Sequence, residues 1–144
     1  MKGFNAALAI FFIVALAGIV AFGNNVTGTP ISEEEFLMDL SQYVNYSESN
    51  LAQSQTRGQS VLFFAATAWC QSCSKLEKEI KENASKIPAN MTILKVDYDN
   101  DKAMNKKYDV VVQHTLVLLD ESGKELKRWV GLGFDELLAQ VNRV

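Results

Sequence analysis

The sequence predicts an α/β domain with a mixed central sheet, preceded by a hydrophobic N-terminal helix. Three observations lead to this prediction. Short apolar runs of strand length alternate with helical patterns, the last two strand-like runs are separated by a turn, and residues 6–22 are apolar throughout. Strands that are joined by helices should be parallel, and the final hairpin should be antiparallel.

The first 23 residues are interpreted as a signal anchor or a signal peptide. Lys2 is the only charged side chain before Glu33, and the apolar run 6–22 follows it. The length of this run lies between the core of a signal peptide, about 7–15 residues, and a spanning helix of about 18 or more. Both interpretations keep Lys2 inside and export the remainder. The chain is therefore expected to be anchored in the membrane through residues 6–22, facing outside the cytoplasm, or to be secreted.

Composition limits the partners and the number of domains. The chain has 144 residues and a formal net charge of −3, with Lys and Arg spread along it. Because no basic patch is present, a nucleic-acid partner is not expected. Two cysteines are too few for a disulfide scaffold. After a linker at residues 24–31, residues 32–144 are expected to form one domain, since 48% hydrophobic and 22% charged residues are typical of a globular protein.

The first elements of this domain are a helix and a buried strand. Ser32 is a good N-cap for a helix. Three glutamates follow it in the first turn, and apolar residues then recur at helical spacing. These apolar positions are Phe36, Leu37, Leu40, Tyr43 and Val44. The helix is expected to fade out in the polar run 47–59. Residues 60–66 form a short apolar run with β-branched and aromatic members, which predicts a buried strand.

The second half of the domain alternates in the same way. A helix opens at the two cysteines and is expected to stop at Pro88. Its buried face is marked by Leu76, Ile80 and Ile87, and its outer face by the pair Glu77 and Lys81. The remaining elements are a strand at 91–96, a helix at 99–107, a strand at 115–119, a turn at 121–124, a strand at 125–130 and a helix at 134–141.

Cys70 and Cys73 are the only cysteines, and they lie where a predicted strand ends and a helix begins. Free N–H groups and the helix dipole favour a thiolate in the first turn. Cys73 lies one turn further along the same face, close enough to attack a disulfide on Cys70. A structural disulfide that closes so short a loop adds little stability. A structural zinc site usually needs four ligands. The chain offers these two and its only histidine, His114, so the spacing suits exchange chemistry better than cross-linking.

Three segments resemble the thioredoxin superfamily, from about Ile31 to the end of the chain: VLFFAATAWCQSC, KVDYDND and KKYDVVVQHTLVLLDESGKELKRWVG. The most specific part is the Trp-Cys-x-x-Cys motif after a strand. The resemblance implies the thioredoxin fold, with helices on both faces of the sheet. It also implies Cys70 as the nucleophile, Cys73 as the resolving thiol and Trp69 as a surface residue beside them. Lys95 falls where the family often has a lysine beneath the active site.

Three features depart from the family pattern. Phe64 stands where thioredoxins usually carry a buried aspartate that can accept a proton, and the cysteines enclose Gln71 and Ser72 instead of Gly-Pro. His114 stands where the family has a cis-proline. If this alignment holds, the imidazole faces the cysteines as a base, a cation or a metal ligand; otherwise it is only a residue before a strand. A cis bond before a residue other than proline costs about 2.5–4 kcal/mol, so the Gln113–His114 bond is expected to be trans.

The predicted function is that of an extracytoplasmic thiol-disulfide oxidoreductase, which reduces or exchanges protein disulfides through Cys70 and Cys73. Trp69, His114 and Lys95 are its supporting residues. Its partners are protein disulfide or dithiol substrates and a redox partner that the sequence does not identify, and the prediction includes no cofactor and no metal. The alternative is a non-catalytic thioredoxin-like binding domain, which holds a client protein, or a metal through Cys70, Cys73 and His114.

Overall fold

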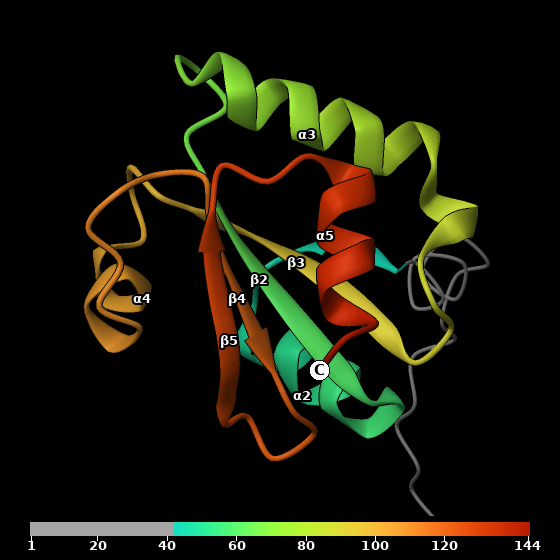
Figure 1. Cartoon of the computed structure of the whole chain (residues 1–144). Coiled ribbons are helices and arrows are strands. Elements are labelled where there is room, and N and C mark those ends of the chain that lie inside the picture. Colours follow the sequence, from blue (N-terminus) through green and yellow to red (C-terminus); the bar gives the residue numbers. More distant parts are fainter. Residues whose placement is uncertain (1–41) are drawn as a thin grey trace, which may run out of the picture. The chain divides into compact units, whose positions relative to one another are not determined.

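The computed structural model describes residues 42–144, which are drawn in colour in Figure 1. The predicted anchor or signal peptide, the linker at 24–31 and the helix from Ser32 as far as residue 41 lie outside the described residues. Within residues 42–144, no helix combines the length and the hydrophobicity that a membrane crossing requires.

A mixed sheet of five strands forms the centre of the domain, in the order β1-β3-β2-β4-β5 (Figure 1). β3 is parallel to both β1 and β2, whereas β4 is antiparallel to both β2 and β5. The expected mixed sheet and its final antiparallel hairpin are therefore confirmed. In chain order, the strands are β1 (Tyr43–Asn45), β2 (Gln59–Ala65), β3 (Met91–Asp97), β4 (Thr115–Leu119) and β5 (Glu125–Val130).

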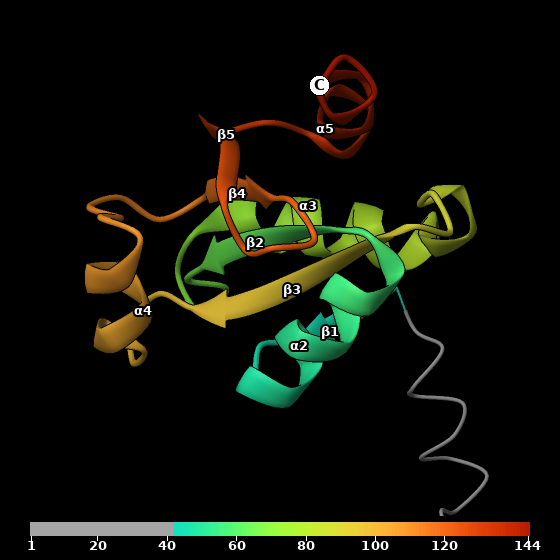
Figure 2. The same cartoon turned by 90° about the horizontal axis from the view of Figure 1, so that it is seen from below.

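Helices cover both faces of this sheet (Figure 2). They are α2 (Glu48–Arg57) on one face and α3 (Gln71–Glu82) and α5 (Phe134–Val141) on the other, while α4 (Lys102–Lys107) lies beyond the end of β3 (Figure 2). On β2, Val61 and Phe63 belong to the core under α3 and α5, whereas Leu62 and Phe64 belong to the core under α2, to which α4 also contributes. Because both faces of β2 are covered, its sequence is a continuous apolar run instead of an alternating one.

The first described strand contradicts the predicted helix. Tyr43 and Val44, expected on the apolar face of that helix, form β1 and lie opposite Ile93 and Leu94 of β3. Tyrosine and valine fit the pleated surface of a sheet, and here pairing with β3 outweighs the helical spacing of the sequence. β1 has three residues, which is too short to show an alternating pattern.

The polar run 47–59, expected to be the fading end of the first helix, contains the separate helix α2. Ser47 is its N-cap, and the Ser47 hydroxyl accepts a hydrogen bond from the N–H of Asn50 at 3.0 Å. The buried side chains of α2 are Leu51 and Ser54. A helix that buries one apolar side chain has no apolar stripe, so its sequence carries no helical periodicity that would predict it.

β4 runs opposite to the predicted direction. The sequence predicts that β3 and β4, which are joined by a helix, run parallel, but β4 is antiparallel to β2 and therefore to β3. The connecting helix α4 has 6 residues, about 9 Å, whereas the 7 residues of β3 extend over about 23 Å. Such a helix does not return the chain across the sheet, and α4 lies beyond the edge where β3 ends (Figure 2). β4 therefore begins at that same edge.

The limits of two helices also differ from the prediction. α3 ends at Glu82 instead of Pro88, and a short 3₁₀ helix, Ala84–Lys86, follows it. Ile87, expected on the face of α3, is buried just after that 3₁₀ helix. The other strands and α5 agree with the predicted ranges to within one or two residues.

α4 begins at Lys102 instead of residue 99. The carboxylate of Asp101 caps it by accepting a hydrogen bond from the N–H of Met104 at 3.0 Å. The preceding residues form a turn around Asp97, which accepts the N–H groups of Asp99 and Asn100. These side-chain bonds compete with helical ones and delay the start of the helix.

Candidate active site

The two cysteines lie where β2 leads into α3, as the sequence predicts. The N–H groups of Trp69 and Cys70 donate to the carbonyl oxygen of Ala66, at 3.2 and 2.8 Å, and this turn connects the strand to the helix. Cys70 is the N-cap of α3, and its sulfur accepts the N–H of Cys73 at 3.2 Å. The free N–H groups of a first turn stabilise a negative charge, so this position favours a thiolate once the disulfide is open.

Cys70 and Cys73 form a disulfide, with their Cα atoms 5.2 Å apart. Cys73 is fully buried, whereas Cys70 is 6% exposed. A sulfur that arrives from outside therefore reaches Cys70 first, and Cys73 attacks from within the protein. This geometry suits the roles of nucleophile and resolving thiol that the resemblance implies, and the roles themselves stay predictions.

His114 lies beside the disulfide, because β4 begins at the edge where β2 ends. One nitrogen of its ring and the two cysteine sulfurs all lie within 4.8 Å of one another. The N–H of His114 donates to the carbonyl oxygen of Phe64 at 2.8 Å, and its own carbonyl accepts the N–H of Gly131 at 3.0 Å. Its φ is +59°, in the left-handed region. No cis peptide bond occurs within residues 42–144, so the Gln113–His114 bond is trans, as expected.

The imidazole of His114 is held by both of its nitrogens. Nε2 lies 3.0 Å from the carbonyl oxygen of Leu132, and Nδ1 lies 2.8 Å from the hydroxyl oxygen of Ser72. Because a carbonyl oxygen only accepts, Nε2 carries a proton, and in the neutral ring Nδ1 is then an acceptor. The ring of Phe63 packs against the imidazole edge to face, with centroids 5.7 Å apart. These contacts fix the orientation of the buried ring.

Ser72 is a site residue that the sequence alone did not indicate. Its hydroxyl lies 2.8 Å from Nδ1 of His114 and 3.3 Å from the sulfur of Cys70. In the sequence it stands out only as half of the dipeptide Gln71-Ser72. A hydroxyl inside the Cys-x-x-Cys motif, together with a histidine in place of the proline, is the signal that could have identified this contact.

Trp69 is 57% exposed in the turn before Cys70, in agreement with the surface position that the resemblance implies. Its indole N–H donates to the carboxylate of Asp99 at 2.8 Å. Since Asp99 belongs to the loop after β3, this hydrogen bond joins the loops that follow the two central parallel strands. A role of Trp69 in the reaction stays a prediction.

Lys95 of β3 is paired with a carboxylate of α3. Its ammonium group donates to both oxygens of Glu77, at 3.0 and 2.9 Å, and Lys81 contacts the same carboxylate at 2.8 Å. The predicted pair of Glu77 and Lys81 is therefore confirmed, with Lys95 as an additional member. Burial alone would raise the pKa of Glu77, but the hydrogen bonds and charges of the two lysines lower it below its ordinary value. Lys95 is thus neutralised by the helix that carries the cysteines, and its functional role stays a prediction.

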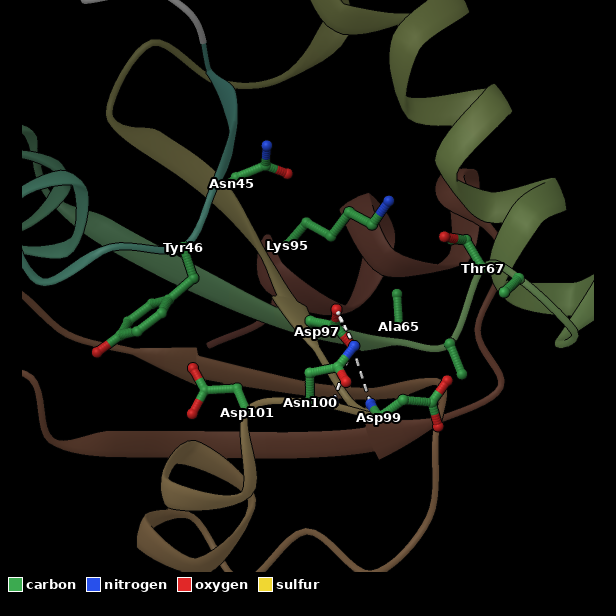
Figure 3. A pocket seen from close by; sticks show the side chains of 11 residues that line it. Asn45, Tyr46, Ala65, Thr67, Lys95, Asp97, Asp99, Asn100 and Asp101 are labelled. Atoms are coloured by element: carbon green, nitrogen blue, oxygen red, sulfur yellow. Dashed lines mark hydrogen bonds between the residues drawn. The ribbon is translucent and has the colours of Figure 1, made fainter.

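A polar cavity of about 390 Å³ opens beside Lys95, along β1, β3 and the loop after β3 (Figure 3). Neither cysteine is among the described residues that line it, and neither is His114. Its acidic side chains already accept hydrogen bonds from the indole of Trp69 or from backbone N–H groups; they are Asp97, Asp99 and Asp101. The cavity is therefore separate from the disulfide and its histidine.

Comparisons with known proteins point to one family. The thioredoxin family model matches residues 42–143. A thioredoxin of Chlamydia trachomatis is 37% identical over 86 residues, 60% of this chain and 81% of that protein. The thiol:disulfide interchange protein DsbD of Actinobacillus pleuropneumoniae is 32% identical over 87 residues, 56% of this chain and 15% of that protein. The crystal structure of a thioredoxin of Nicotiana alata is similar with a TM-score of 0.60 and 28% identity, over 72% of this chain and 92% of that chain.

Proposed function

The chain belongs to the thioredoxin family, and from this premise we propose that it is a thiol-disulfide oxidoreductase that acts on protein disulfides outside the cytoplasm. One observation carries the proposal: the disulfide at the start of α3, with Cys70 at the N-cap and Cys73 buried behind it. The names of the relatives, thioredoxin and thiol:disulfide interchange protein, support the same chemistry.

In the reductive direction, the Cys70 thiolate attacks one sulfur of a substrate disulfide, and the other substrate sulfur leaves as a thiolate and takes up a proton. The Cys73 thiolate then attacks the Cys70 sulfur of this mixed disulfide and releases the second substrate thiol. Two electrons pass from the cysteine pair to the substrate, and the disulfide of the structure is the product. A redox partner must supply two electrons to reduce it. The reverse sequence donates the disulfide to a reduced substrate.

The surroundings of the disulfide support a polypeptide substrate. Trp69 is exposed before Cys70, and Val111 and Val112 are exposed in the loop before His114. Exposed apolar side chains on the segments that flank a reactive sulfur suit the side chains of a polypeptide better than a small hydrophilic disulfide.

Reduction of insulin tests the oxidoreductase. The full chain, supplied with dithiothreitol, should accelerate the precipitation of reduced insulin, and Cys70→Ser should abolish this acceleration. Cys73→Ser should instead accumulate a mixed disulfide through Cys70, because the resolving thiol is missing. Ser122→Ala, in the exposed turn between β4 and β5, is the control for substitution as such. Unchanged turnover by Cys70→Ser would overturn the proposal.

The alternative function is a non-catalytic binding domain for a client protein or a metal. Its geometric support is the proximity of one ring nitrogen of His114 to both cysteine sulfurs. The structure uses these atoms otherwise, since the sulfurs are bonded to each other and both ring nitrogens have hydrogen-bond partners. Zinc retained by the reduced protein, together with absence of insulin turnover, would decide for the alternative.

The location outside the cytoplasm is supported by the sequence. Lys2 and the apolar run 6–22 have the pattern of a segment that directs or anchors an exported protein. Membrane contact through residues 6–22 and the exported position of the cysteines therefore belong to the proposal.

A further inference from the structure

We propose that Ser72 relays a proton between the Cys70 thiol and His114, so that the histidine acts as the base for Cys70 through a hydroxyl group. This inference rests on the proposed function, because it concerns how the reduced cysteine pair becomes reactive. It starts from three groups that lie in series in the disulfide form: the sulfur of Cys70, the oxygen of Ser72 at 3.3 Å from it, and Nδ1 of His114 at 2.8 Å from that oxygen. Reduction gives the Cys70 sulfur the proton that this series can carry.

The arrangement of the ring explains why the hydroxyl is needed. Nε2 of His114 donates to the carbonyl oxygen of Leu132, and Nδ1 is taken by Ser72. Both ring nitrogens are therefore engaged, and neither is left to bond the Cys70 sulfur directly. The backbone bonds of His114 to Phe64 and Gly131 hold the ring at this place. The connection from imidazole to sulfur passes through Ser72.

The proton transfer balances without any other reactant. In the reduced protein, the Cys70 thiol donates to the Ser72 oxygen, and the Ser72 hydroxyl donates to Nδ1 of His114. The thiol proton then moves to the Ser72 oxygen while the original Ser72 proton moves to Nδ1. The result is a thiolate that accepts from Ser72, and an imidazolium that donates to Ser72 and Leu132. The proton stays on the ring until a departing thiolate or water accepts it.

Besides Cys70, the ring has one further titratable neighbour within residues 42–144, the Cys73 thiol of the reduced protein. Phe63 of β2 and the carbonyl of Leu132 after β5 pack against the ring, and the start of α3 supplies Ser72 and the cysteines. Within residues 42–144, no salt bridge joins His114 to a carboxylate. The imidazole of His114, reached through the Ser72 hydroxyl, is therefore the base that these contacts offer to Cys70.

Alkylation of Cys70 by iodoacetamide tests the relay in the reduced full chain. The rate is measured from pH 5 to pH 10, with the label located by peptide mapping. Ser72→Ala should slow alkylation at neutral pH by about tenfold or more, the range expected for a lost hydrogen bond to a charged group. Ser72→Thr, which keeps the hydroxyl, should restore the rate. Gln71→Ala, in the same dipeptide, is the matched control.

A double-mutant cycle separates a relay from two independent effects. His114→Asn removes the base but tolerates the left-handed backbone. In a relay, the double variant Ser72→Ala/His114→Asn is no slower than the slower single variant. At alkaline pH, where the thiol ionises without help, all variants should reach the rate of the unsubstituted chain, because Ser72 is exposed and packs in no core. An unchanged rate in Ser72→Ala, or single effects that multiply, would overturn the relay.

Failure of the relay and failure of the proposed function give different results. Alkylation reads the ionisation of Cys70 and needs no disulfide substrate. A chain that shows the relay but does not reduce insulin would contradict the oxidoreductase only. A chain that reduces insulin with equal rates for unsubstituted protein and Ser72→Ala would contradict the relay only.

Discussion

The backbone N–H of His114 donates a hydrogen bond of 2.8 Å to the carbonyl oxygen of Phe64. By the resemblance of the sequence to thioredoxins, these two residues take the positions of the family's proline and aspartate, so the two expected departures from the family pattern are in direct contact. Proline has no N–H, and this bond therefore depends on the departure itself. The contact also holds the beginning of β4 against the end of β2, where the cysteine segment starts.

Restoring the proline of the family should destabilise this protein. His114→Pro loses the N–H that binds Phe64, and a proline φ near −65° does not fit the observed +59°. We expect the free energy of unfolding to fall by about 3 kcal/mol or more. His114→Asn, which keeps the N–H and tolerates a positive φ, should lose less. Urea unfolding of the oxidised proteins measures both, and equal losses would argue against a backbone cause.

The two cysteines should differ in reactivity. Cys70 lies at the N-cap of α3 and is 6% exposed, whereas Cys73 is fully buried. In the reduced protein at mildly acidic pH, an alkylating reagent should therefore modify Cys70 first. Peptide mapping after brief treatment identifies the labelled sulfur. Preferential labelling of Cys73 would reverse the roles of nucleophile and resolving thiol.

Glu77 should stabilise the fold in a pH-dependent way. Glu77→Gln removes the carboxylate that binds Lys95 and Lys81, and should lower the free energy of unfolding by about 1–3 kcal/mol at pH 7. Glu82→Gln is the matched control on the same helix, because the pair of Glu82 and Lys78 is long, at 3.8 Å, and exposed. This control should change the stability by less than about 0.5 kcal/mol.

The sign of the pH dependence follows from the lowered pKa of Glu77. Its ordinary value is 4.5 and the value in the folded protein is lower. The stabilisation is therefore fully present above the ordinary value and is lost as the pH falls through the lower, folded value. The difference between unsubstituted protein and Glu77→Gln should narrow below about pH 4.5. A difference that stays constant from pH 7 to pH 3 would show that charge is not its origin.

Export of the cysteines can be tested in intact cells. After mild reduction, a membrane-impermeant maleimide should label the cysteines of the full chain without lysis. A variant without residues 1–23 should become labelled only after lysis, because it lacks the apolar run. Protection of the full chain until lysis would contradict an exported domain.

The parts of the fold that were predictable are those with a strong local signal. The buried strands 60–66, 91–96 and 115–119 are continuous apolar runs, and the structure confirms them within a residue. β1 and α2 were not predictable because neither has such a signal: β1 has 3 residues, and α2 buries one apolar side chain. The direction of β4 depends on the length and place of α4, which periodicity does not report.

The candidate site also has a predictable and an unpredictable part. The Cys-x-x-Cys motif is predictable from the sequence, because the cysteine spacing and the position before a helix are typical of thiol-disulfide exchange. The contact of Ser72 with His114 spans 42 residues, and no local pattern relates the two. The two residues meet because β4 is antiparallel to β2, which places the first residues of β4 beside the end of β2. The pairing of Lys95 with Glu77 was also not predictable, because the helical spacing indicates only the pair of Glu77 and Lys81.

Under the proposed relay, the antiparallel direction of β4 also means that the reactivity of the cysteine pair develops only as the chain folds. An unfolded chain already contains both sulfurs, but its Cys70 has neither the N-cap environment nor the histidine, and it behaves as an ordinary thiol. The N-cap environment forms from residues of α3 next to Cys70 in the sequence. His114 comes to lie beside Cys70 only when residues 114–119 have paired with β2. A chain interrupted before β4 would therefore carry the complete motif and still exchange disulfides slowly.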